Sequence, residues 1–201
     1  MKTQIWIRTR AVREHFTPDL SFVPPLQRRR LSSLQRVMFS ICQDLAGGER
    51  DYTLFFASRD GEYRLTHRLV DDYREEGEVS PLRFSTSVYN AAPGLFSVFT
   101  GNRSAYSALA AGEETVECGL LEALLERGNR LWVYAEETGG GYGCGAMLAD
   151  EPGVGTPLLL TPGEARRPLL TFDAVKAFLG GEGRRLEGRY LTLEVTEGSR
   201  W

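Results

Sequence analysis

The chain has 201 residues, of which 42% are hydrophobic and 25% are charged, and its net charge is −3. A globular chain of this length buries roughly 70% of the surface that it exposes when unfolded, so its core needs no disulfide. The slightly acidic balance argues against the basic surface of a nucleic-acid-binding protein. Three widely spaced cysteines, Cys42, Cys118 and Cys144, offer neither a disulfide framework nor a metal-binding spacing. We therefore expect no metal and no cofactor.

The N-terminal segment and the hydropathy of the chain bear on its location. Residues 1–10 are too charged, and their apolar run is too short, for a signal peptide. No segment approaches the ~20 apolar residues of a membrane span. The sequence predicts a cytoplasmic protein without a membrane span, in which residues 1–201 form a single domain.

The first elements are predicted from residue patterns and helix stop signals. Residues 4–12 mix β-branched and charged side chains, which indicates an edge strand. A helix is expected from Pro24-Pro25 to Gly47-Gly48, because apolar side chains recur there at spacings of three, four and seven. Six more elements follow in chain order: a buried strand at 52–57, a helix capped by Ser58 or Asp60 and ending at Gly77, a helix at 92–100, a strand at 104–109, a helix at 113–127, and a buried strand at 131–135.

The C-terminal third has a weaker pattern. Residues 139–145 are rich in glycine and predict a flexible hairpin connection into residues 146–149. A Pro/Gly-rich connection follows, and then a short helix at 173–179 and a strand at 190–195. The alternation of strands and helices predicts a layered α/β domain with a mixed, mainly parallel sheet and helices on both faces.

The most informative stretch joins the strand at 104–109 to the helix at 113–127. The strand runs into a turn containing Gly112, and the helix starts directly afterwards. This layout resembles the nucleophile turn of β-ketoacyl synthases, in the thiolase superfamily, which is roughly Thr-Ala-Cys-Ala-x-Gly. Residues 107–112 are Ser-Ala-Leu-Ala-Ala-Gly, so Leu109 stands at the position of the nucleophilic cysteine. Because leucine has no lone pair to attack a thioester, the resemblance implies a scaffold without its reaction.

The resemblance extends from about Pro24 to Glu137. In order and spacing, several short pieces resemble the N-terminal half of a β-ketoacyl synthase, and more closely the small chain-length-factor-like subunits of aryl polyene and related polyketide or fatty-acid systems. Tyr89 departs from these relatives, which often carry histidine there, and residues 151–201 form a weakly matched C-terminal extension. The pieces are Arg28-Arg-Arg-Leu31, Ser58-Arg-Asp-Gly-Glu62, Ser80-Pro81, Phe84-Ser-Thr-Ser-Val-Tyr-Asn-Ala91, Gly94, Gly101-Asn102 and Ala108-Leu-Ala-Ala-Gly-Glu113.

The resemblance implies a non-catalytic, thiolase-fold subunit that pairs with an active β-ketoacyl synthase and shapes the acyl tunnel. A full synthase takes two catalytic histidines from a second half, whereas this chain has only His15 and His67. In thiolase-fold dimers the strand before the nucleophile turn pairs antiparallel with its counterpart. The implied interface residues are Phe96, Phe99, Ser104, Ala105, Tyr106, Ser107 and Ala108.

One dense basic cluster lies on the first predicted helix. It contains Arg28, Arg29 and Arg36. Acyl carrier proteins are acidic, so long-range attraction to this cluster would steer one towards the chain. The alternative is a solvated helix face, with Arg30 partly buried and bonded to backbone carbonyls or a carboxylate.

Two other functions stay open. An active acyltransferase or thioesterase would use Cys118 with His67, which requires the two side chains to approach within about 3–4 Å at a pocket. Against this alternative, the sequence pattern around Cys118 is typical of a thiol in the core, and the pattern around His67 is typical of a solvated helix face. The other alternative is a homodimeric acyl-binding module with no synthase partner. Cys42 is expected in the core, and Cys144 in an exposed turn.

Overall fold

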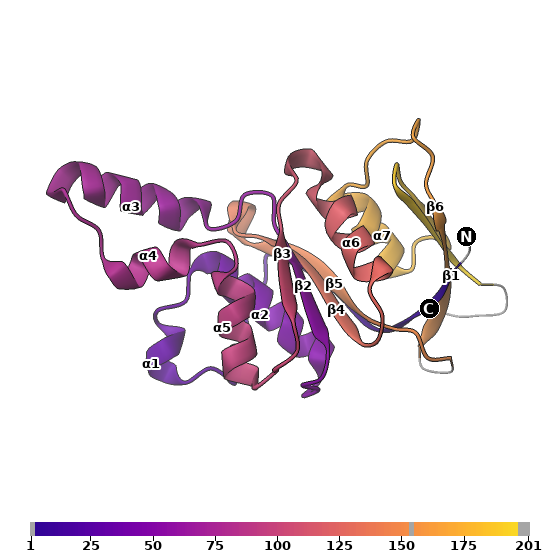
Figure 1. Cartoon of the computed structure of the whole chain (residues 1–201), viewed down its shortest axis with the longest axis horizontal. Coiled ribbons are helices and arrows are strands. Elements are labelled where there is room, and N and C mark those ends of the chain that lie inside the picture. Colours follow the sequence, from indigo (N-terminus) through magenta and orange to yellow (C-terminus); the bar gives the residue numbers. More distant parts are fainter. Residues whose placement is uncertain (1–2, 153–154, 197–201) are drawn as a thin grey trace.

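A computed structural model describes residues 3–152 and 155–196 (Figure 1). Met1 and Lys2, the start of the charged N-terminal segment, lie outside the described residues. One sheet has the strand order β3–β2–β4–β5–β1–β6–β8–β7. In chain order its strands are β1 (Thr3–Glu14), β2 (Thr53–Ala57), β3 (Tyr106–Leu109), β4 (Arg130–Glu136), β5 (Tyr142–Ala149), β6 (Thr156–Pro162), β7 (Arg185–Glu187) and β8 (Leu191–Val195).

The helices lie on both faces of this sheet. None of them, in the described part of the chain, combines the length and apolarity that a membrane-spanning helix needs. They are α1 (Pro25–Arg28), α2 (Ser33–Ala46), α3 (Tyr63–Glu76), α4 (Pro81–Ser87), α5 (Ala91–Thr100), α6 (Thr115–Leu125) and α7 (Phe172–Gly180), with short 3₁₀ turns at η1 (Gly112–Glu114) and η2 (Thr138–Gly140).

The sheet is mixed, as predicted, but its two halves differ. β2 pairs parallel with β3 and with β4, whereas the described pairings from β4 to β7 are antiparallel. The antiparallel share is larger than the strand–helix alternation predicts, because β4–β5 and β7–β8 are joined without a helix between them. The predicted edge position of the first strand is wrong. β1 lies between β5 and β6, because the Pro/Gly-rich segment contains a strand that pairs with its outer side.

Two apolar cores lie on opposite faces of the sheet, because neighbouring residues of a strand point to opposite sides. In β4, Trp132 and Tyr134 belong to the core under α6 and α7. Leu131 and Val133 belong to the core under α2 and α5. The pair α3–α4 projects sideways from the second layer (Figure 1). The layered arrangement with helices on both faces is confirmed.

The predicted first helix is divided in two. α1 is a single turn that begins after Pro24, and α2 starts afresh at a capping box. The Ser32 hydroxyl accepts from the Gln35 N–H (3.0 Å), and the Gln35 side-chain oxygen accepts from the Ser32 N–H (3.2 Å). Gly47, at φ 56°, ends α2 in the left-handed conformation, as the sequence predicts.

The glycine-rich run is not the flexible connection that its composition suggests. β5 already begins at Tyr142, and Gly143 and Gly145 lie inside it beneath α2. A Cβ on Gly145 would lie 2.5 Å from the Trp132 carbonyl oxygen and 2.8 Å from a Leu45 methyl carbon. The glycines therefore let helix and sheet approach closely. Cys144, between them, is fully buried rather than exposed.

We expect Gly145→Ala to lower the free energy of unfolding by about 2 kcal/mol or more, because the added methyl group overpacks the α2–β5 contact. Urea unfolding followed by circular dichroism measures this. Gly180→Ala is the matched control, since the nearest atom to its added Cβ lies 3.9 Å away. Equal stability of Gly145→Ala and the wild type would contradict the close packing.

Candidate functional site

The candidate site lies where the parallel strands end. β2, β3 and β4 run in the same direction and finish at Ala57, Leu109 and Glu136. In α/β sheets, ligands bind in the crevice outside the carboxyl ends of the strands. The loops that follow these three residues therefore form the candidate site.

Leu109 is the last residue of β3, and the helical segment begins three residues later at Gly112. This confirms the predicted strand, glycine turn and helix start. The Thr115 hydroxyl stabilises the turn, because it accepts from the Ala111 N–H (2.9 Å) and donates to the Gly112 carbonyl (2.7 Å). Leu109 itself is half-buried.

Tyr89 connects the ends of β2 and β3. Its hydroxyl accepts from the Ser58 N–H (2.7 Å) and lies within hydrogen-bond reach of the Ser58 and Leu109 carbonyl oxygens. The ring fits because Gly61 has no side chain, and a Cβ there would lie 2.9 Å from Tyr89. Burial raises the pKa of Tyr89, so the phenol stays neutral. Tyr89 thus fixes the backbone next to Leu109.

Buried carboxylates shape the loop after β2. Glu136 accepts from the Ser58 hydroxyl (2.9 Å), from the Asp60 N–H (3.3 Å) and from the Arg59 N–H. Glu137 accepts from the N–H of Arg64 at the start of α3 (2.8 Å). Burial raises the pKa of Glu136. The sequence pointed to the loop itself but not to these carboxylates.

Glu62 is the third buried carboxylate of this region. One of its oxygens accepts from the Ser32 hydroxyl (2.8 Å) and the Gln35 amide (2.9 Å). Its other oxygen has no hydrogen-bond partner among the described residues. Burial, together with the nearby charge of Glu137, raises the pKa of Glu62 to about 7, against the lowering effect of the two hydrogen bonds and of the Arg68 charge.

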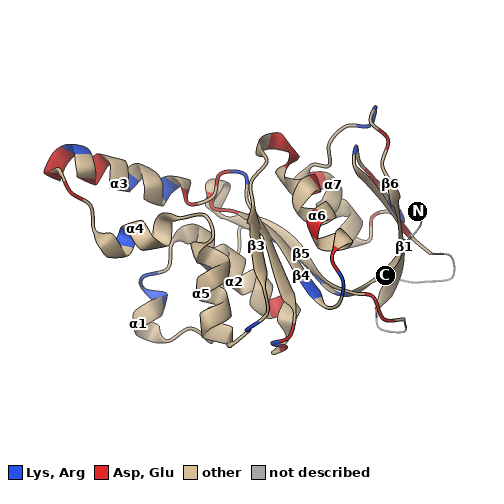
Figure 2. Ribbon diagram, in the orientation of Figure 1, with Lys and Arg blue, Asp and Glu red and all other residues tan. Residues whose placement is uncertain are grey.

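A cavity of about 520 Å³, which we call the α6 cavity, opens at the start of α6. One wall is formed by Gly112, Glu113, Thr115 and Val116, and another by residues 169–173 from the C-terminal part. Glu117 of α6 holds that part in place, because its buried carboxylate accepts from the N–H groups of Leu170 (3.0 Å), Leu191 (3.3 Å) and Tyr190. Acidic residues lie at this end of α6 (Figure 2). The C-terminal part of the chain therefore contributes a wall of the α6 cavity.

The structure does not bring Cys118 and His67 together. Cys118 lies on α6, whereas His67 stacks on Tyr63 (ring centroids 4.2 Å apart) on the projecting α3 (Figure 1). Burial, with the charges of Glu114 and Glu117, raises the pKa of Cys118 and disfavours the thiolate. Neither side chain lines the α6 cavity. No group of three or more metal-ligating side chains occurs among the residues that the structure describes.

The predicted interface residues fall into two groups. Tyr106 is exposed and lies over Gly94 of α5, where a Cβ would come within 3.2 Å of its hydroxyl oxygen. In contrast, Phe96 is fully buried against Phe39 (ring centroids 5.3 Å apart), so its ring is not available for direct contact with a partner. Exposed or half-buried positions are Phe99, Ser104, Ala105, Ser107 and Ala108.

Further contacts define the exposed surface of this edge. The Ser107 hydroxyl donates to Glu122 of α6 (2.6 Å). Val98 of α5, which the sequence analysis did not single out, is 74% exposed. Among the described strands, β3 pairs with β2 alone, so its other edge is open.

The arginine cluster is also divided. Arg28 donates to the Val23 carbonyl (2.9 Å), and Arg36 donates to the Leu31 (3.1 Å) and Arg28 (2.7 Å) carbonyls. These are the backbone contacts that were expected of Arg30, which is instead exposed. Arg29 is exposed and makes no side-chain hydrogen bond or ion pair within the described ranges. Of the three predicted docking residues, Arg29 alone therefore presents an unengaged guanidinium.

The family model described as "Beta-ketoacyl synthase, N-terminal domain" matches residues 4–137, two thirds of the chain. The chain belongs to this family. The resemblance from Pro24 to Glu137 is thus confirmed, and this β-ketoacyl synthase N-terminal domain includes β1–β4 and α1–α6. No curated protein matches the chain.

Solved structures support the fold of this β-ketoacyl synthase N-terminal domain. One is described as a ketosynthase (ApeO) in complex with its chain length factor (ApeC) from Xenorhabdus doucetiae. The match has a TM-score of 0.66 at 20% identity and covers 85% of this chain and 80% of the other. The thiolase-like fold is therefore confirmed.

The pKa of Glu62 predicts a pH dependence of stability. Between its ordinary pKa of 4.5 and about 7, the folded chain retains a proton that the unfolded chain has released. The free energy of unfolding therefore falls as pH rises through this window and levels off above it. We expect the wild type to lose about 1–3 kcal/mol relative to Glu62→Gln between about pH 5 and 8.

Urea unfolding of both proteins at the two pH values measures this difference. The exposed Glu75→Gln is the control and should show the same change of stability with pH as the wild type. A stability difference between wild type and Glu62→Gln that does not change with pH would contradict a proton held at Glu62.

Proposed function

We propose that this chain is a non-catalytic, chain-length-factor-type subunit that pairs with an active β-ketoacyl synthase in fatty-acid or polyketide biosynthesis of the aryl polyene type. The observation that carries the proposal is Leu109 at the end of β3, three residues before the helical segment that begins at Gly112 and continues into α6. A thiol at this point would be activated by the helix N-terminus, but a leucine side chain supplies no nucleophile.

The other candidate groups support the same conclusion. Cys42 and Cys144 are buried, and burial raises the pKa of both thiols, so neither favours a thiolate. His67 lies on α3, and His15 lies in the N-terminal part beside Gly140. The proposal assigns the cysteine and the histidine pair to the partner synthase, with this chain supplying a wall and a dimer surface in a cytoplasmic complex.

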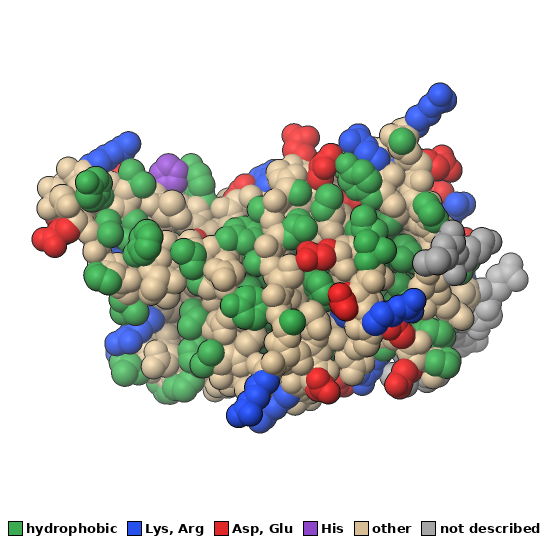
Figure 3. All heavy atoms as spheres, in the orientation of Figure 1, with side chains coloured by type: hydrophobic (Ala, Val, Ile, Leu, Met, Phe, Trp, Pro, Cys, Tyr) green, Lys and Arg blue, Asp and Glu red, His purple; other side chains and the backbone are tan. Residues whose placement is uncertain are grey.

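The open edge of β3 supports a partner at this surface. Tyr106 and Val98 expose apolar area there, and hydrophobic side chains spread over the face that α4, α5 and β3 present (Figure 3). Aromatic side chains contribute strongly to interface free energy. The match to a chain of a ketosynthase–chain length factor complex agrees with such pairing.

For an acidic carrier protein, we propose the exposed Arg29 as the residue that attracts it.

Acyl labelling tests the absence of a nucleophile. The purified chain, incubated with acyl-CoA or acylated carrier protein, should show no covalent acyl adduct by intact mass spectrometry, while an active β-ketoacyl synthase in parallel does. Stable labelling of Cys118 or Cys144 under native conditions would contradict the proposal. Cys118→Ser serves as a control that identifies any adduct at that thiol.

Tyr106→Asp tests the interface. A carboxylate desolvated against a partner strand should weaken association at least about tenfold. Co-expression with a β-ketoacyl synthase encoded beside it, followed by light scattering and titration calorimetry, measures this. Tyr73→Asp, an exposed position on α3, is the matched control and should bind like the wild type. If Tyr106→Asp forms the same dimer as the wild type, this interface is wrong. A stable homodimer that does not bind the synthase would favour the acyl-binding module.

A further inference from the structure

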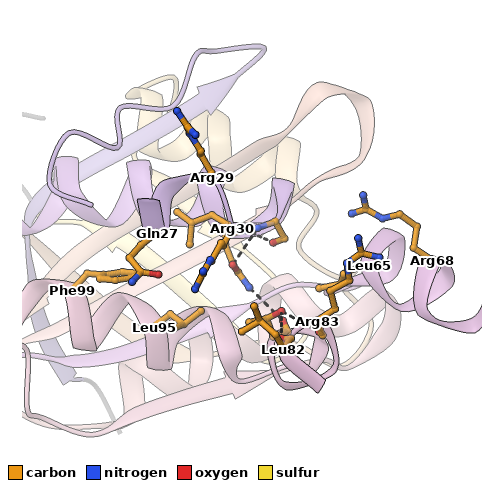
Figure 4. A pocket seen from close by; sticks show the side chains of 13 residues that line it. Gln27, Arg29, Arg30, Leu65, Arg68, Leu82, Arg83, Leu95 and Phe99 are labelled. Atoms are coloured by element: carbon orange, nitrogen blue, oxygen red, sulfur yellow. Dashed lines mark hydrogen bonds between the residues drawn. The ribbon is translucent and has the colours of Figure 1, made fainter. Parts of the chain in front are cut away.

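The lining of a second cavity, of about 430 Å³, includes neither Leu109 nor any other residue of β3. The cavity is enclosed by the α1–α2 connection, α3, α4 and α5 (Figure 4). We call it the arginine-rimmed cavity. Its volume is within the range of small-molecule sites, which combine an apolar lining with a few polar groups.

The lining of this cavity is largely apolar. It is made by side chains from four different segments, namely Leu31, Leu65, Leu82, Leu95 and Phe99. Leu31 and Leu65 are buried in the chain, whereas Leu82 is 53% exposed. Such a surface favours an alkyl chain or ring, because burying it removes apolar area from water.

The charged residues that line the cavity are arginines, namely Arg29, Arg30, Arg68 and Arg83. The buried carboxylate of Glu62 accepts from the lining residues Ser32 and Gln35, and its charge interacts with that of Arg68. Arg83 pairs with Asp72 (2.9 Å), but the side chains of Arg30 and Arg68 make no hydrogen bond or ion pair within the described part of the chain. Arg30 lies between Gln27 and Leu95, Arg68 and Arg83 lie on the other side, and Arg29 points away (Figure 4).

We propose that the arginine-rimmed cavity binds a free medium-chain carboxylate, with its alkyl chain on the leucine lining and its carboxylate at Arg30. Arginine suits this role because its planar guanidinium binds carboxylates through paired hydrogen bonds. A neutral chain would leave the guanidinium group of Arg30 unpaired, and a cationic chain would be repelled. The inference rests on the cavity alone and does not require a synthase partner.

Titration calorimetry of the full chain with decanoate, below its micellar concentration, tests the site. We expect saturable binding at one site, weakened by added salt. Decan-1-ol and decylammonium, with the same chain but no negative charge, should bind at least about tenfold more weakly. Absence of saturable decanoate binding, or equal affinity for decan-1-ol, would overturn the proposal.

Variants locate the binding. Arg30→Gln should lower decanoate affinity at least about tenfold, and Leu82→Asn should lower it through the apolar lining. Arg74→Gln is the matched control, since Arg74 lies on α3 beside Asp71 (3.7 Å) and outside the cavity. Circular dichroism confirms that each variant is folded. Unchanged affinity in Arg30→Gln, or an equal loss in Arg74→Gln, would overturn the assignment.

Discussion

The carboxylate of Glu136, buried at the end of β4, is the group around which the loop after β2 is built. It accepts hydrogen bonds from the backbone of Arg59 and Asp60 and from the Ser58 side chain. Since buried polar groups are costly when unpaired, these donors and this acceptor stabilise one another only in one loop conformation. That conformation places the Ser58 backbone beside Tyr89, and Tyr89 in turn reaches the end of β3.

A second buried carboxylate, that of Glu117, attaches the C-terminal part to the family domain in the same way. Glu117 lies in α6, within the family match, and binds backbone N–H groups at Leu170, Tyr190 and Leu191, which lie beyond it. The contact is close, because a Cβ on Gly188 would lie 2.4 Å from the Glu117 carboxylate. Residues 156–195 therefore complete the sheet and the wall of the α6 cavity.

Local signals predicted the parts of the fold that local chemistry determines. The left-handed glycines Gly47 and Gly77 end their helices where expected, and Leu109 ends its strand before a glycine turn. The signals failed where distant segments decide the outcome. β6 lies in the Pro/Gly-rich segment, where no strand was predicted. Because β6 pairs with β1, β1 lies in the interior of the sheet rather than at its edge. The burial of Phe96 could not be predicted locally, because the rings that cover it, those of Phe22 and Phe39, belong to distant segments of the chain.

The candidate site shows the same division. The strand, turn and helix start of the site were predicted from residues 104–115. The glutamates that hold its loops could not be predicted, because glutamate is usually exposed and only the folded structure shows that these are buried. The break before Ser32 did have a local signal, because the residues Ser32-Ser-Leu-Gln35 match a capping box. The apolar periodicity between Pro24 and Gly48 did not show this break, and the contact of Ser32 with Glu62 depends on the fold.

Tyr89 also has a consequence for association. Because the Leu109 carbonyl is held by Tyr89 and by the Ser58 N–H (3.3 Å), the strand that ends there is ordered before any other molecule arrives. Binding normally costs conformational entropy when loops and side chains become fixed. An edge strand that is already rigid loses little of that entropy, so more of the free energy of strand pairing would remain as affinity.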